Sequence, residues 1–180
     1  YLFFSERVFT KGCKLNLSRQ IKIGDFVIGG DSLPILIAGP CVIENKEITF
    51  KCAEVLRQIS EELNINVIFK SSFDKANRSS SSSYRGPGLE DGLGILSEVK
   101  QKTGLPVLSD VHSISDVVQS AKILDVLQIP AFLCRQTDLI KSASECGKII
   151  NVKKGQFLSP SDMKNVISKF QSYGCHDILI

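Results

Sequence analysis

The run VIFKSSFDKANR, residues 67–78, places a short apolar segment directly before a loop rich in lysine, arginine and serine. The loop continues through a serine run to residue 88 and contains the cations Lys70, Lys75, Arg78 and Arg85. Lysine offers a point charge, arginine a fork of donors, and serine or asparagine neutral donors, so the segment can replace the water shell of a phosphate group. The alternative is a solvated basic loop, because a loop carries function only where a scaffold positions it.

Four other apolar runs indicate that scaffold. They lie at residues 35–38, 107–109, 126–129 and 149–152, each bounded by glycine, proline or polar residues. Nearly continuous apolar runs of this length are typical of buried parallel strands. Between the runs, apolar residues at helical spacing predict helices over residues 48–63, 89–102, 117–124 and 163–170. Strand and helix therefore alternate along the chain.

Two of these helices have start signals in the sequence. Ser159 followed by Pro160 opens the helix at 163–170, since proline at a first helical position needs no amide partner. Ser113 or Ser115 is expected to cap the helix at 117–124. In the first helix, Val55, Leu56 and Ile59 are expected to share the buried face.

Polar residues at the strand ends favour a barrel over a doubly wound sheet. Parallel strands joined by right-handed crossovers allow either architecture. Polar side chains follow successive strands, as they do around a barrel mouth: Cys41, Lys70, Asp110, Gln128 and Lys153. The turn at residues 38–41 lacks the Gly-x-Gly-x-x-Gly spacing of a dinucleotide site. We therefore predict an α/β fold, a (β/α)8 TIM barrel.

The chain accommodates about five strand–helix units and the start of a sixth strand at residues 178–180, whereas a whole barrel takes about 250 residues. We expect that a C-terminal portion follows or is supplied by something else, because an uncovered parallel strand leaves a sheet edge. Residues 21–28 alternate about a Gly-Asp turn and predict a β-hairpin over the amino-terminal end of the barrel. The expected division is an N-terminal extension at 1–20 and a partial-barrel domain at 21–180.

Charge and cysteine spacing limit the partners and the compartment. The net charge is +3, from 22 Lys and Arg against 19 Asp and Glu, which is too balanced for a nucleic-acid surface. The apolar start of the chain is interrupted at once by polar residues, so we expect no membrane segment. Six cysteines without Cys-x-x-Cys spacing predict free thiols in a reducing, cytoplasmic setting.

From about residue 36 to 180, the chain resembles the Kdo-8-phosphate synthase family. The resemblance depends on ordered motifs: AGPCVIE at 38–44, FKSSFDKANRSS at 69–80, YRGPGLE at 84–90, DVH at 110–112, QIPAFL at 128–133 followed by RQTDL at 135–139, and NVKKGQF at 151–157. The resemblance implies a (β/α)8 barrel, usually a homotetramer. It also implies condensation of phosphoenolpyruvate with arabinose 5-phosphate and water, releasing phosphate on the way to the Kdo of lipopolysaccharide.

The resemblance also implies roles for particular residues. The residues matching the phosphoenolpyruvate site are Lys70, Lys75, Lys153, Gln128 and the backbone around Ala131. Those matching the pentose-phosphate site are Asn77, Arg78 and Ser79, with Arg135 matching a residue that reaches a neighbouring subunit's sugar phosphate. Asp110 matches the sugar and metal end of the site. Lys75, Lys153 and Asp110 are the expected catalytic residues. The alternatives are a surface role for each lysine, an interface salt bridge for Arg135 and a turn-capping role for Asp110.

Cys41 stands where the family divides into metal-dependent enzymes, with cysteine, and metal-free ones, with asparagine. The resemblance therefore implies a divalent metal (Zn, Fe or Mn) in the full-length enzyme, with Cys41 as a ligand. The matching His, Glu and further Asp ligands fall beyond residue 180, so we expect no metal on this chain alone. A small buried thiol is the alternative, and His112 is expected to be structural.

Three hypotheses remain open from the sequence. The first is Kdo-8-phosphate synthesis. The second is the heptulosonate-phosphate synthase reaction of the same superfamily, against which the Lys-Ala-Asn-Arg-Ser-Ser motif at 75–80 argues. The third is a truncated, non-catalytic partial barrel that binds anions or pairs with a partner chain.

Overall fold

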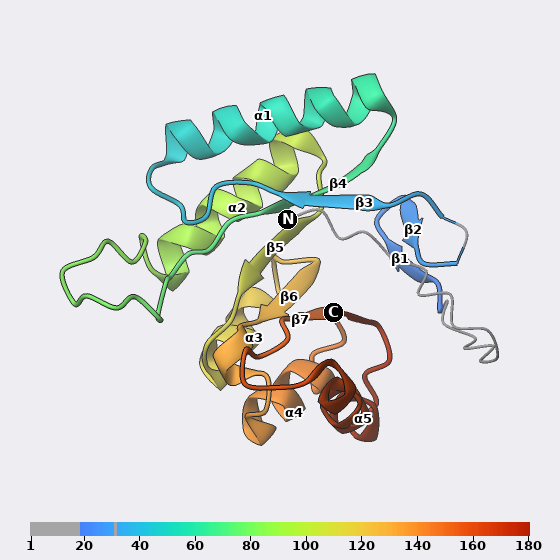
Figure 1. The fold of residues 1–180 in the computed structure, drawn as a ribbon. Helices are drawn as coiled ribbons and strands as arrows, with labels where there is room; N and C mark the ends of the chain where they lie inside the picture. Colours follow the sequence, from blue (N-terminus) through green and yellow to red (C-terminus); the bar gives the residue numbers. More distant parts are fainter. Residues whose placement is uncertain (1–18, 31) are drawn as a thin grey trace.

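The fold is a curled parallel sheet with helices along its outer side and a small hairpin at one end (Figure 1). The computed structural model describes residues 19–30 and 32–180, so the expected extension at 1–20 lies almost wholly outside the described residues. The six strands follow the order β3-β4-β5-β6-β7-β8, and every neighbouring pair is parallel. A strand order that repeats the chain order is the wall of a (β/α) barrel. The described part of the chain is therefore a partial barrel, as predicted.

The strand positions confirm the sequence prediction. The strands of the sheet are β3 Ile35–Ala38, β4 Asn66–Lys70, β5 Val107–Asp110, β6 Val126–Ile129, β7 Ile149–Val152 and β8 Ile178–Leu179. The apolar side chains of β4, β5, β6 and β7 are almost all buried, because the sheet has a core on both faces. In the described chain, β3 and β8 are the two edges of the sheet.

The helices agree with the prediction less completely. They are α1 Lys46–Leu63, α2 Leu89–Thr103, α3 Ile114–Ser120, α4 Thr137–Glu145 and α5 Met163–Ser172, with short 3-10 helices at η1 Ala131–Leu133 and η2 Pro160–Asp162. The helix expected at 117–124 begins three residues earlier and ends four residues earlier. The sequence prediction missed α4, because its nine residues are fewer than the window of about 11–18 residues over which helical periodicity is read.

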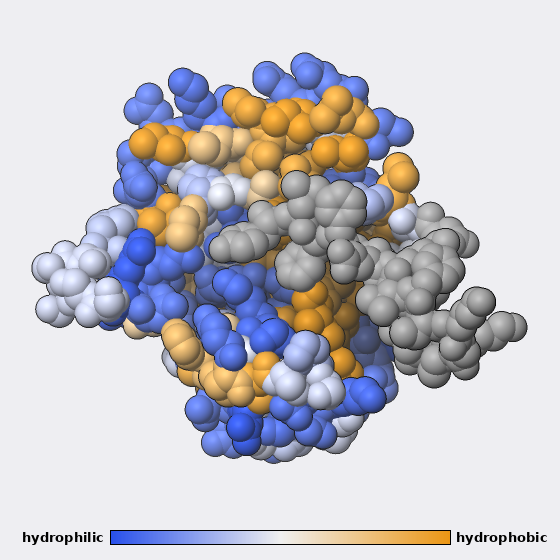
Figure 2. Space-filling view, in the orientation of Figure 1, coloured by the Kyte–Doolittle hydropathy of each residue, from blue (hydrophilic) through white to orange (hydrophobic). Residues whose placement is uncertain are grey.

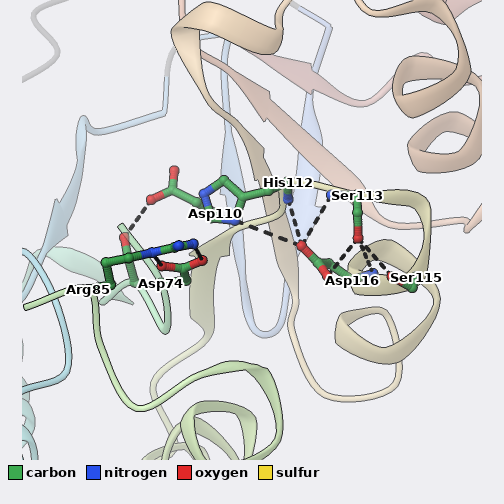
Figure 3. Close-up of polar contacts among 8 residues, drawn as sticks. Asp74, Arg85, Asp110, His112, Ser113, Ser115 and Asp116 are labelled. Atoms are coloured by element: carbon green, nitrogen blue, oxygen red, sulfur yellow. Dashed lines mark hydrogen bonds and ion pairs between the residues drawn. The ribbon is translucent and has the colours of Figure 1, made fainter. Parts of the chain in front are cut away.

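Side-chain caps fix where two of these elements begin. Ser113, not Ser115, caps α3: its hydroxyl accepts from the N–H of Asp116, whose carboxylate accepts from the N–H of Ser113. Figure 3 shows this capping box. Ser159 forms the same reciprocal pair with Asp162 at η2, ahead of α5. Such a box satisfies two amide donors that would otherwise lack partners.

The core has two parts, one on each face of the sheet. The larger part lies between the sheet and the helices and includes Phe69 and Phe170, both fully buried. The smaller part lies on the inner face, where Ile68 and Leu108 pack against Ile23 of the hairpin. The hairpin consists of β1 Ile21–Ile23 and β2 Phe26–Ile28, turning at a glycine with φ of 55°. The predicted hairpin is confirmed, and it closes the inner core.

Part of the apolar face predicted for α1 is exposed to solvent rather than buried. Leu56 packs on the core, but Val55 is 46% exposed, together with Ile48 and Leu63 on the same helix. Figure 2 shows orange surface at the top of the molecule, where Figure 1 places α1. This helix packs against β4 and α2 at the β3 edge of the described sheet, so fewer neighbours cover it.

Two simple properties complete the description. Among residues 19–30 and 32–180, no helix is long and apolar enough to cross a membrane. In the same part of the chain the cysteines are free thiols: Cys41, Cys52, Cys134, Cys146 and Cys175.

Candidate functional site

Three polar side chains form a row across the carboxyl ends of β5, β6 and β7. The strand register pairs Asp110 with Gln128, and Gln128 with Asn151. The amide of Asn151 donates to the Gln128 side-chain oxygen at 2.8 Å, and the Gln128 amide donates to the Asp110 carboxylate. All three residues are only 5–6% exposed. Because buried polar groups are costly unless paired, this row has one preferred arrangement.

The hydroxyl of Ser72 joins this row to two lysines. It donates to Asp110 Oδ2 at 2.5 Å and accepts from Lys75 Nζ at 2.8 Å and from Lys70 Nζ at 3.4 Å. The ammonium of Lys75 also lies 3.7 Å from Asp110 Oδ2. Ser72 is fully buried in the segment that follows β4. Ser72 was not among the residues expected from the sequence, although it stands between the two lysines that it connects.

The charges of this cluster are strongly coupled. Burial lowers the pKa of Lys70, and the neighbouring cations Lys75 and Lys153 lower it further, against the opposite effect of Asp110. Burial alone raises the pKa of Asp110, but Lys70, Lys75 and the hydrogen bonds from Ser72 and Gln128 outweigh it, so the net pKa is below its usual value. The site therefore holds an ionised carboxylate beside two cations, and a further anion has cations available to it.

The lysine after β7 and the cysteine after β3 lie near the same cluster. Both lie close enough to Lys70 to affect its pKa, which Lys153 lowers and Cys41 raises, and both side chains are exposed. The backbone N–H of Lys153 donates to Ile129 at 3.1 Å. Gly39 brings the Cys41 turn against β4: a Cβ at Gly39 would lie 2.1 Å from the Lys70 carbonyl oxygen. Four of the expected residues, Lys70, Lys75, Asp110 and Gln128, thus meet through side-chain contacts, with Lys153 and Cys41 beside them.

The residues expected to hold a sugar phosphate lie in the exposed loop after β4. Asn77, Arg78 and Ser79 are all exposed. Arg78 Nε donates to the Tyr84 carbonyl at 3.3 Å, and both residues line an open hollow with Val42, Glu44, Asn45 and Ser83. The guanidinium fork of Arg78 therefore borders a solvent-filled space large enough for a small anion.

Arg135 and Ala131 occupy the segment after β6. Ala131 begins η1, and its carbonyl oxygen approaches Gly155, where a Cβ would lie 3.1 Å away. Arg135 is exposed and lines a second hollow with His112 and Thr137. The structure does not bring Arg135 to the lysine cluster within this chain. His112 packs edge-on against Phe73 at 6.1 Å between ring centroids, and its structural role stays a prediction.

Arg85, the fourth cation of the phosphate-binding hypothesis, is engaged elsewhere. Its Nε and Nη2 donate to the two carboxylate oxygens of Asp74 at 2.8 and 2.5 Å. Figure 3 shows the two side chains facing each other. The Asp74 hydrogen bond and charge raise the pKa of Arg85. This cation is already neutralised, so the loop offers Lys70, Lys75 and Arg78 to a ligand.

The described residues do not make up a complete metal site. Within residues 19–30 and 32–180, no three His, Cys, Asp or Glu side chains are grouped as metal ligands. Cys41 is exposed, and the Asp110 carboxylate is engaged by Ser72 and Gln128. Tight zinc sites need about four ligands. A single available thiol does not meet that requirement.

The chain belongs to the DAHP synthetase I family, whose model matches residues 14–180. Its curated relatives are named 2-dehydro-3-deoxyphosphooctonate aldolase. The protein of Geobacter sp. (strain M21) is 56% identical over 164 residues, which cover 91% of this chain and 60% of the relative. Those of Geotalea uraniireducens (strain Rf4) and Trichlorobacter lovleyi (strain ATCC BAA-1151 / DSM 17278 / SZ) are 56% and 54% identical, again over 60% of their length. The chain thus spans about 60% of the length of these relatives.

Proposed function

We propose that the intact protein condenses phosphoenolpyruvate with arabinose 5-phosphate and water, giving Kdo 8-phosphate and inorganic phosphate. The observation that carries this proposal is the buried network of Lys70, Lys75, Ser72 and Asp110 at the carboxyl ends of the strands. It occurs in a chain 51–56% identical to relatives named for the corresponding octonate. Active sites of (β/α) barrels lie at this end of the strands.

In this proposal the lysine cluster binds phosphoenolpyruvate. Lys70, Lys75 and Lys153 bind its phosphate and carboxylate groups, with Gln128 and the backbone at Ala131 completing the pocket. Fixed cations next to a buried carboxylate cost no reorganisation when charge develops during bond formation. Asp110 opposes the effect of burial on the pKa of Lys70, and its carboxylate lies 3.7 Å from the ammonium group of Lys75 and helps to hold it in place. Lys75, Lys153 and Asp110 are the residues proposed to contact the reacting groups.

The loop after β4 is proposed to hold the second substrate. Asn77, Arg78 and Ser79 bind the phosphate of the pentose, and Arg78 supplies the charge-assisted contacts. The aldehyde carbon of the sugar then meets the methylene carbon of phosphoenolpyruvate, and the new carbon–carbon bond forms between them. Water adds its oxygen to the carbon that carries the phosphate, and one of its protons goes to the former aldehyde oxygen. The bond between that carbon and the phosphate oxygen then breaks, which leaves a ketone and releases phosphate with the second proton. This balances the atoms of the proposed reaction.

The test is phosphate release by the full-length protein from phosphoenolpyruvate with two aldose phosphates. Arabinose 5-phosphate is expected to give a kcat/KM well above that with erythrose 4-phosphate, the shorter sugar of the heptulosonate reaction. A preference for erythrose 4-phosphate would establish the heptulosonate alternative. No release with either sugar would favour the anion-binding, non-catalytic alternative.

We also propose that the full-length protein holds Zn²⁺, Fe²⁺ or Mn²⁺ with Cys41 as one ligand, and that the remaining ligands come from outside the described residues. A thiolate suits a borderline cation. Cobalt loading should give a thiolate-to-metal absorption band that is lost in Cys41→Ser. The same band in the variant, or near-stoichiometric metal on the 180-residue chain alone, would show that Cys41 has been misinterpreted.

The proposal extends to assembly and compartment. A homotetramer would allow Arg135, which lies away from the lysine cluster in its own subunit, to reach a neighbour's sugar phosphate. Light scattering should then give four times the subunit mass, and a monomer would contradict it.

We place the protein in the cytoplasm, where phosphoenolpyruvate is made; cell fractionation tests this placement.

A further inference from the structure

The loop between β4 and α2 has a narrow neck. The N–H of Lys75 donates to the Arg85 carbonyl at 2.7 Å, and the N–H of Gly88 donates to the Phe73 carbonyl at 3.1 Å. Residues 73–75 and 85–88 therefore run side by side. The residues between them, 76–84, form a tip that leaves the body of the protein and returns to it.

An ion pair closes this neck. Asp74 and Arg85 form a two-bond fork, with both donor–acceptor distances at or below 2.8 Å. Planar pairing of this kind fixes orientation as well as distance. Asp74 immediately precedes Lys75, and Arg85 immediately follows Tyr84, so the pair joins the two points where the tip begins and ends (Figure 3).

The neck begins at a residue buried in the core. Phe73 is 1% exposed and belongs to the main core. Gly86 has φ of +125°, and a Cβ there would lie 2.3 Å from the Phe73 carbonyl oxygen, so only glycine permits this approach. The tip is tied to the β3–α1 loop by the Tyr84 hydroxyl, which donates to the Ile43 carbonyl at 3.0 Å. The ion pair thus connects a buried base to an exposed tip.

We propose that the Asp74–Arg85 pair is a clamp that positions the tip for the sugar-phosphate substrate, without contacting that substrate. The inference rests on the proposed function, in which Asn77, Arg78 and Ser79 of the tip bind the phosphate. Freeing the neck lets the tip adopt more conformations, and the apparent affinity falls in proportion to the fraction that is competent. Loss of the ion pair also loosens Lys75, because the N–H of Lys75 donates to the Arg85 carbonyl. We expect this effect to be smaller, since Ser72 also accepts a hydrogen bond from the Lys75 ammonium group.

Three variants test the clamp in the full-length protein: Asp74→Asn, Arg85→Gln and the exchange Asp74→Arg with Arg85→Asp. Each single variant should raise KM for arabinose 5-phosphate by about three- to tenfold and KM for phosphoenolpyruvate by less than about twofold. The exchange restores an ion pair of opposite polarity and should recover most of the loss. A general structural defect would change both constants and would not be rescued by exchange.

A matched control removes an arginine charge from an ion pair outside the neck. Arg57 pairs with Glu61 through one exposed contact on α1, at 2.9 Å. Arg57→Gln should leave both Michaelis constants unchanged. An equal rise in KM for the sugar in Arg57→Gln would mean that net charge, rather than the clamp, is responsible.

Limited trypsin digestion gives a readout that does not depend on activity. Cleavage after Arg78, followed by mass spectrometry, should be several-fold faster in Asp74→Asn and Arg85→Gln than in the unmodified protein, and slow again in the exchange variant. Unchanged cleavage and unchanged KM in both single variants would overturn the clamp. An unmodified protein without synthase activity would overturn the proposed function, while the cleavage rates would still decide whether the pair holds the tip.

Discussion

Asp110→Asn removes the single negative charge from a cluster that contains two lysines. The carboxylate is 6% exposed, lies 3.7 Å from the ammonium of Lys75 and accepts hydrogen bonds from Ser72 and Gln128. Breaking a buried ion pair by removing one partner costs about 3–5 kcal/mol. Lys75 retains 15% side-chain exposure, so we expect about 3 kcal/mol, the lower end of that range.

The assay is urea unfolding at pH 7, compared with Glu61→Gln, which removes an exposed carboxylate of α1. The midpoint should fall in Asp110→Asn at an unchanged slope, whereas the control should lose about 0–1 kcal/mol. Because the folded pKa of Asp110 lies below its usual value of 3.8, its contribution is present above that pH. The contribution is lost as the pH falls through the folded pKa.

The difference between the unmodified protein and Asp110→Asn should therefore be constant near neutrality and shrink on acidification below about pH 4. The same variant should change the pKa of Lys70. The Asp110 carboxylate raises this pKa, so its removal should lower the pKa of Lys70 further. A variant as stable as the control at pH 7, or a difference independent of pH down to the acid transition, would refute this account of the cluster.

Three further predictions concern single side chains. Arg78→Ala should raise KM for arabinose 5-phosphate by the loss of a charge-assisted contact, about 1.5–3 kcal/mol, measured by initial rates; an unchanged KM would remove Arg78 from the sugar site. Lys153→Ala should weaken phosphoenolpyruvate binding by a similar amount in calorimetry without lowering the unfolding midpoint, and equal affinity would place Lys153 outside the site. Gly86→Ala should destabilise the fold by about 1–3 kcal/mol, because φ is +125° there and the added Cβ would lie 2.3 Å from the Phe73 carbonyl oxygen. A melting temperature equal to that of the unmodified protein would argue against this close contact.

The strands could be predicted because each is a short apolar run, and polar residues lie at or near the carboxyl ends of β4, β5, β6 and β7. The prediction missed α4, whose nine residues include two serines and are too few to give a clear helical pattern. For Val55 the local spacing was helical, but burial depends on what covers the far side of α1, which local sequence does not specify.

Parts of the site were also readable from sequence. Lys70, Asp110 and Gln128 stand at the ends of successive strands, and parallel pairing brings such positions together. Ser72 and Asn151 were missed because their importance depends on hydrogen bonds across strands. Arg85 was grouped with the phosphate-binding cations, and only the folded loop shows that Asp74 neutralises it.

The central claim is that the lysine cluster condenses phosphoenolpyruvate with a pentose phosphate. The most direct measurement incubates the full-length protein with both substrates and quantifies released phosphate and the product by mass spectrometry, beside Lys75→Gln. The account predicts one phosphate per molecule of Kdo 8-phosphate, a requirement for both substrates, and loss of both products in Lys75→Gln. Phosphate release without arabinose 5-phosphate, or equal product from Lys75→Gln, would contradict it.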